Sequence, residues 1–164
     1  MTANSPNRPS PRVNTPVQNQ ESRSRQSPQQ EQSSEITEKL VSKIRGFTGG
    51  LKSYSIRELV QDAEAFGPYL KQRRLETNQI RKFLDAINRI KADLTEGTEF
   101  SKIETDVVLL KPKLAYAAAR QAPAKPLSDV MAAAIDQVHS REDFDRLVQL
   151  IESIIAYHKA EGGK

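Results

Sequence analysis

Apolar side chains recur at helical spacing from residue 35 to the end of the chain, and this period constrains the fold more than any other feature. The clearest stripe is Ile80, Phe83, Leu84, Ile87 and Ile90, which share one face of a helix. Burying these side chains contributes roughly 8–15 kcal/mol, at about 1.5–3 kcal/mol each. No segment shows a convincing strand pattern. The chain is therefore predicted to be all-α, a compact bundle of five to six helices.

Polar caps and helix breakers divide this region. Ser55 and Glu58 predict a capping box, in which the hydroxyl and the carboxylate each satisfy a free backbone amide. Further caps are expected at two helix starts, from Thr77 at one and from Ser140 and Asp143 at the other. A proline inside a helix lacks the amide donor and clashes with the preceding turn, so Gly67 and Pro68 are expected to kink or break their helix.

Residues 1–34 differ in composition from the rest of the chain. Ser, Pro, Gln and Asn make up 22 of these 34 residues, and the apolar side chains are Met1, Ala3, Val13 and Val17. Such a segment cannot bury enough surface to offset its conformational entropy. We expect a disordered Ser/Pro/Gln/Asn-rich tail over 1–34 and a helical bundle domain over 35–164.

Composition excludes several kinds of site. The sequence has no cysteine, which excludes disulfides and thiolate metal sites. No apolar run approaches the roughly 18 residues of a membrane span, and the N-terminal residues contain no hydrophobic region of a secretory signal. A cytoplasmic protein without membrane association is expected.

Catalytic motifs are also missing from the sequence. The two histidines, His139 and His158, fall near helix ends, where a structural role is favoured over catalysis. The sequence contains no glycine-rich phosphate loop, H-E-x-x-H or G-x-S-x-G. The acids at Glu142, Asp143 and Asp145 begin a helix, and helix capping explains them without a metal. We expect no catalytic residue, no metal and no cofactor.

Positive charge is concentrated in two stretches, residues 71–91 and residues 111–125, although the net charge of the chain is only +4. On the predicted third helix, the face opposite the apolar stripe carries Asn78, Arg81, Lys82, Asp85, Asn88 and Arg89. Arg81 to Arg89 spans about 12 Å, enough for roughly three successive phosphates. The full set of candidate RNA-binding residues comprises Arg73, Arg74, Asn78, Arg81, Lys82, Arg89, Lys111, Lys113 and Arg120. From charge alone, a nucleic-acid interface and an ordinary solvated face both stay open.

The tyrosines give less support to base stacking. Tyr116 and Tyr157 are interpreted as core or interface residues because each lies beside small or apolar neighbours. Recognition of the RNA backbone by charge is favoured over stacking on bases.

Three segments together resemble the small α-helical subunit of type III-A CRISPR (Csm) effector complexes. They are LETNQIRKFLDAINRIK at 75–91, LLKPKLAYAAARQ at 109–121 and FDRLVQLIESIIAYHKAEGG at 144–163. The resemblance covers roughly residues 51–163. It departs from the family pattern at Ala119 and at Ile151-Glu152-Ser153, which are changes of packing scale.

The resemblance implies a non-catalytic RNA-binding subunit that acts in antiviral defence. Such subunits stack in several copies along the guide RNA–target RNA duplex, beside backbone subunits and a large subunit that carry the catalytic activities. Arg81, Lys82, Lys111, Lys113 and Arg120 match the family's basic positions, whereas Arg73, Arg74, Asn78 and Arg89 follow from helix geometry. Two alternatives remain: a helical adaptor that binds an acidic protein without RNA, and the equivalent small subunit of a type III-B complex.

Overall fold

The computed structural model describes residues 2–3, 9, 11 and 28–164, without the side chains of residues 28–33. Within these residues the helices are α1 Pro28–Arg45, α2 Ile56–Gln72, α3 Thr77–Asp93, α4 Glu104–Val108, α5 Leu110–Arg120, α6 Lys125–Asp136 and α7 Arg141–Ala160. Three single-turn 3₁₀ helices, η1 Leu51–Ser53, η2 Phe100–Lys102 and η3 Ala122–Ala124, lie in the connections. Six of the α-helices have 11 to 20 residues and α4 has five, which confirms the predicted all-α bundle.

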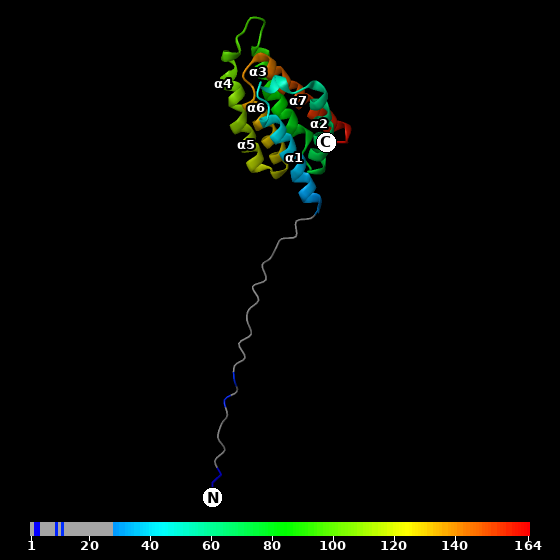
Figure 1. Cartoon of the computed structure of the whole chain (residues 1–164), viewed down its shortest axis with the longest axis vertical. Coiled ribbons are helices and arrows are strands. Elements are labelled where there is room, and N and C mark those ends of the chain that lie inside the picture. The colour runs from blue at the N-terminus through cyan, green and yellow to red at the C-terminus, as the bar shows by residue number, and fades with distance from the viewer. Residues whose placement is uncertain (1, 4–8, 10, 12–27) are drawn as a thin grey trace.

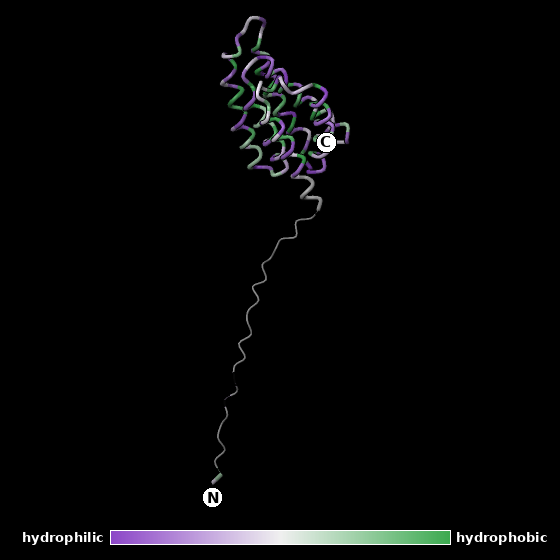
Figure 2. The backbone as a smooth tube through the Cα atoms, in the orientation of Figure 1, coloured by the Kyte–Doolittle hydropathy of each residue, from purple (hydrophilic) through white to green (hydrophobic). Residues whose placement is uncertain are grey.

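The long C-terminal helix α7 lies at the centre of the packing. It contacts α2 most extensively and also packs against α3, while α6 packs against α1 and α5. Phe144, Leu147, Ile151 and Ile154 of α7 are buried in one continuous core. Figure 1 shows α4 and α5 following one another along an edge of the bundle. Hydrophilic and hydrophobic residues alternate along the helices in Figure 2, as the sequence period predicts.

Gly67 permits the close approach of α2 and α7. A Cβ atom at this position would lie 2.7 Å from the backbone nitrogen of His158, 2.7 Å from Tyr157 Cβ and 3.0 Å from the carbonyl oxygen of Ile154. α2 continues through Pro68 to Gln72, so the prediction that the helix could break there is wrong. Pro68 removes the donor to the carbonyl of Glu64, whose side chain is exposed to solvent. Water can satisfy that carbonyl, and packing on α7 keeps the helix continuous.

Polar groups tie the helix ends together. Ser140 caps α7 as predicted, and the Asp143 carboxylate accepts hydrogen bonds from the backbone amides of Lys52 at 2.7 Å and His139 at 3.0 Å. The Asp143 side chain is only 2% exposed, and by accepting both hydrogen bonds it connects η1 to the start of α7. The acid that the sequence placed at a helix start therefore also holds two segments together.

The capping box at α2 forms in part. The amide of Glu58 donates to the Ser55 hydroxyl, as predicted. The Glu58 carboxylate accepts from that same hydroxyl at 3.3 Å rather than from a backbone amide.

Thr77 does not cap α3, so this prediction is wrong. Glu76 occupies the N-cap position without a side-chain hydrogen bond, and the Thr77 hydroxyl lies 3.2 Å from Nδ1 of the buried His158. Nε2 of His158 donates to the carbonyl of Leu75 at 2.7 Å. His158 therefore joins the end of α7 to the α2–α3 connection, which is a structural role of the kind expected.

The predicted tail of residues 1–34 lies largely outside the described residues. Its last residues are part of α1, which begins at Pro28 within the predicted tail. Proline suits the first turn of a helix, and Gln and Glu have good helix propensity. This start carries no apolar stripe, which is why the sequence period did not indicate it. The division between tail and domain at residue 35 stays a prediction.

Candidate nucleic-acid interface

α3 presents one apolar face to the core and one polar face to solvent. Ile80, Phe83, Ile87 and Ile90 are buried, and Leu84 is half-buried. The predicted residues on the opposite side, Asn78, Arg81, Lys82 and Arg89, are all exposed. The sequence correctly separated the two faces of this helix.

α5 is arranged in the same way. Leu110 and Leu114 are buried, whereas Lys113, Tyr116 and Arg120 are exposed. Their spacing of three and four residues places Lys113, Tyr116 and Arg120 along one side of the helix.

A surface groove of about 470 Å³ lies between α3 and α5. Its apolar lining includes Leu75, Phe83, Leu110, Leu114 and Leu127. The predicted residues that line it are Asn78 and Lys82 from α3 and Lys113 and Arg120 from α5. Two basic stretches that are distant in the sequence thus meet at one site, which we call the α3–α5 groove.

The cations of the α3–α5 groove are available to a ligand. Lys82, Lys113 and Arg120 have no carboxylate of another described residue within 4.0 Å. Glu76 is the acid in the groove lining, so three positive charges outnumber one negative charge there. Such a local field attracts anions and holds phosphates in particular.

Tyr116 and Arg120 form a pair at the edge of this groove. The guanidinium of Arg120 donates to the Tyr116 hydroxyl at 3.0 Å and lies 5.6 Å from the ring centroid. Tyr116 is 64% exposed, so it is not a core residue, and the interface role that the sequence left open for it stays a prediction. The spacing of Tyr116 and Arg120, four residues apart, was the signal in the sequence that could have indicated the pair. Tyr157, in contrast, is partly buried against the core.

The remaining candidate residues lie outside the α3–α5 groove. Lys111 is half-buried and forms an ion pair with Asp136 of α6. Arg73 lines a separate pocket with Lys125. Arg81 and Arg89 are exposed on α3 but do not line the groove.

Arg74 has an unusual backbone conformation. Its φ angle is 63°, in the left-handed region that favours glycine, directly after the last turn of α2. The amide of Leu75 donates to the carbonyl of Leu70, which completes a Schellman-type helix end around Arg74. A glycine would adopt this conformation with less strain.

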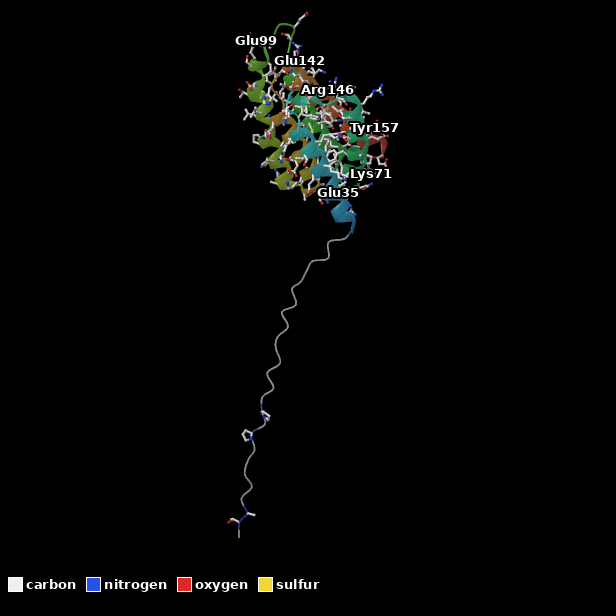
Figure 3. The ribbon with its side chains drawn as sticks, in the orientation of Figure 1. Glu35, Lys71, Glu99, Glu142, Arg146 and Tyr157 are labelled. Carbon is white, nitrogen blue, oxygen red and sulfur yellow. The ribbon has the colours of Figure 1, made fainter. Side chains whose placement is uncertain are left out.

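The described part of the chain contains no group of three or more His, Cys, Asp or Glu residues that could hold a metal ion. Glu99 and Glu142 lie near one end of the bundle, and Glu35 and Lys71 lie near the other (Figure 3).

Tyr54 is buried, and its hydroxyl donates a hydrogen bond to Asp62 at 2.6 Å. Burial, and then this hydrogen bond, raise the pKa of the Tyr54 hydroxyl above its ordinary value. Within the described residues no helix is long and apolar enough to cross a membrane.

Comparison with known proteins identifies the family. A family model described as Csm2 Type III-A matches residues 53–164 of the chain. The chain belongs to this Csm2 family. A Csm2 protein of Streptococcus thermophilus, described as a CRISPR system Cms protein, is 30% identical over 92 residues, which cover 55% of this chain and 75% of that protein. No solved structure matches.

The Csm2 match confirms the resemblance found in the sequence. Its matched span includes every candidate RNA-binding residue, from Arg73 to Arg120, and both helices that form the α3–α5 groove. The matching model is the type III-A one, so the type III-B alternative loses its support.

Proposed function

We propose that this small subunit of a type III-A CRISPR complex binds RNA without catalysing a reaction, and that the α3–α5 groove is its main RNA contact. The observation that carries the proposal is the convergence of Lys82, Lys113 and Arg120, which are exposed and have no acidic partner among the described residues. Phosphate contacts by such residues add affinity without reading sequence. That behaviour suits a complex in which base pairing by the guide selects the target.

In this role the subunit stacks in several copies beside the backbone and large subunits, along guide and target RNA, in the cytoplasm. Val108 and Leu109, where α4 meets α5, are each about half exposed. A neighbouring subunit would cover these apolar side chains on the same edge of the bundle that carries the groove. Weak binding by one copy would be multiplied by the effective concentration of stacked copies.

Charge reversal in the groove tests the proposal. The double variant Lys82→Glu/Lys113→Glu should lose most of the RNA retained by the purified complex while the helical circular dichroism spectrum stays unchanged, because both side chains are exposed. For the full-length chain, the slope of log affinity against log salt should fall by about 1.4, at roughly 0.7 for each phosphate contact on a single strand.

Arg57→Glu is the control for charge reversal at a single exposed site outside the groove. Arg57 is exposed on α2, which contributes no residue to the groove, and a negative charge near the start of that helix is favourable. Unchanged RNA retention in the double variant would refute the groove assignment. A ribonuclease-resistant complex that contains no RNA would instead support the adaptor that binds an acidic protein.

A further inference from the structure

A second pocket lies outside the α3–α5 groove, where α1 and the end of α2 meet the start of α6. We call it the α1–α2–α6 pocket. Its volume is about 470 Å³, within the roughly 300–1,000 Å³ of small-molecule sites. α1 contributes Thr37 and Glu38, which precede the residues 53–164 that the Csm2 model matches. The pocket is therefore built in part from a segment outside the matched span.

Two hydroxyls that line this pocket have no hydrogen-bond partner among the described residues. Thr37 is 8% exposed, and its Oγ1 is buried without a partner. Tyr69 is 5% exposed, and no group of the described chain bonds to its hydroxyl. A hydroxyl that has lost its hydrogen bonds to water without gaining others destabilises the folded state. A polar ligand in the pocket would supply the missing partners.

Four charged side chains also line the α1–α2–α6 pocket. Lys125 donates to both carboxylate oxygens of Asp129 at 2.9 Å, so these two charges are matched. Arg73 and Glu38 have no oppositely charged partner within 4.0 Å in the described part of the chain. Arg73 is half-buried and Glu38 is exposed, so both are accessible from solvent. The pocket thus presents one unmatched positive charge and one unmatched negative charge.

We infer that the α1–α2–α6 pocket binds a free amino acid with an apolar side chain. The carboxylate of the ligand accepts hydrogen bonds from Arg73 and from the two buried hydroxyls, and its ammonium group pairs with Glu38. Ala118 and Ala122 line the pocket with small apolar groups, which leave room for the side chain of the ligand.

An RNA phosphate fits this pocket less well than an amino acid does. It carries no positive charge for Glu38, and two acids balance the two cations of the lining, so a polyanion is not attracted. The inference therefore goes beyond the proposed RNA binding and does not depend on it.

Matched probes test the inference by NMR titration of the isotope-labelled full-length chain at neutral pH. L-Leucine carries both charges, isocaproate has the same carbon skeleton without the amino group, and isoamylamine has it without the carboxylate. Leucine should bind roughly 10- to 150-fold more tightly than either, the range expected for losing a hydrogen bond to a charged group. The amide signals that shift should belong to the residues around Thr37, Tyr69 and Lys125.

Substitutions in the pocket separate the two ends of the ligand. Arg73→Gln should weaken binding of leucine and isocaproate roughly 10-fold or more, whereas Glu38→Gln should weaken binding of leucine and isoamylamine. The control is Glu35→Gln, because Glu35 is exposed on the same helix, pairs with Lys39 and does not line the pocket.

Thr37→Val distinguishes a binding role from a structural one. The substitution removes the hydroxyl and keeps the branched shape of the side chain. Since the hydroxyl has no partner among the described residues, Tm of the free protein should not fall, yet leucine should bind more weakly.

The remaining outcomes would overturn the inference. They are equal affinities for the three probes, signal shifts away from the pocket, or no shift with leucine, valine or methionine at millimolar concentration. A loss of RNA retention in Arg73→Gln without any response to leucine would assign Arg73 to RNA instead. Charge reversal in the α3–α5 groove leaves leucine binding unchanged, so failure of the proposed RNA function and failure of this inference are distinguishable.

Discussion

Replacing Gly67 by alanine is expected to destabilise the bundle at the α2–α7 contact. Alanine normally stabilises a helix interior relative to glycine by about 1 kcal/mol. Here its Cβ would lie 2.7 Å from a backbone nitrogen and 2.7 Å from another Cβ, and both atoms belong to α7. Neither atom is the end of a flexible side chain, so the two helices must move apart.

The size of the effect follows from these opposing contributions. Overpacking a close contact costs about 1–3 kcal/mol, and a contact with backbone belongs at the upper end of that range. After subtraction of the helix-propensity gain, we expect a net loss of about 1–2 kcal/mol. For a domain of this size that lowers Tm by roughly 3–8 °C.

Thermal and urea unfolding followed by circular dichroism would measure this loss. Gly46→Ala is the control, because its Cβ would lie 3.3 Å and 3.4 Å from two carbonyl oxygens and would meet no second helix. Its free energy of unfolding should change by less than about 0.5 kcal/mol. A Gly67→Ala protein that is as stable as the parent chain, or more stable, would refute the claim that this glycine sets the helix separation.

Two further substitutions test individual structural contacts. Asp143→Ala leaves the amides of Lys52 and His139 without their acceptor, so it should lower the free energy of unfolding by about 2–4 kcal/mol in urea titrations. The control is Glu142→Ala at the exposed neighbouring residue, which should change the free energy of unfolding by under about 0.5 kcal/mol. Equal effects of the two would contradict the role assigned to Asp143. Arg74→Gly places a glycine in the left-handed backbone conformation, so it should raise Tm and increase the free energy of unfolding by about 1 kcal/mol. A variant that is less stable than the parent chain would disprove backbone strain at Arg74. If Arg74 also contacts RNA, the same variant should retain less RNA.

The α3–α5 groove also alters the expected mode of recognition. The charge pattern favoured contact with the RNA backbone alone, because Tyr116 was assigned to the core or to an interface. Its exposed ring beside Arg120 makes stacking on a base physically reasonable at the same site. Charge and stacking then act on one strand, and neither requires a particular sequence.

The sequence alone determined the helical class, most helix positions and the polar face of α3. These properties are local, because the period of apolar residues specifies which side of a helix is buried. The same reasoning correctly identified the Ser140 cap and a structural role for His158. It missed the start of α1, where no apolar residue marks the helix.

Only the tertiary structure decided which charged residues act together. It brings Asn78 and Lys82 beside Lys113 and Arg120, pairs Lys111 with Asp136 and leaves Tyr116 in solvent. A helical period specifies a buried face but not the neighbour against which that face packs. The neighbour depends on contacts between residues far apart in the chain, such as the close approach of Gly67 to α7. For that reason the set of basic residues was predictable, whereas the groove that unites four of the candidate residues was not.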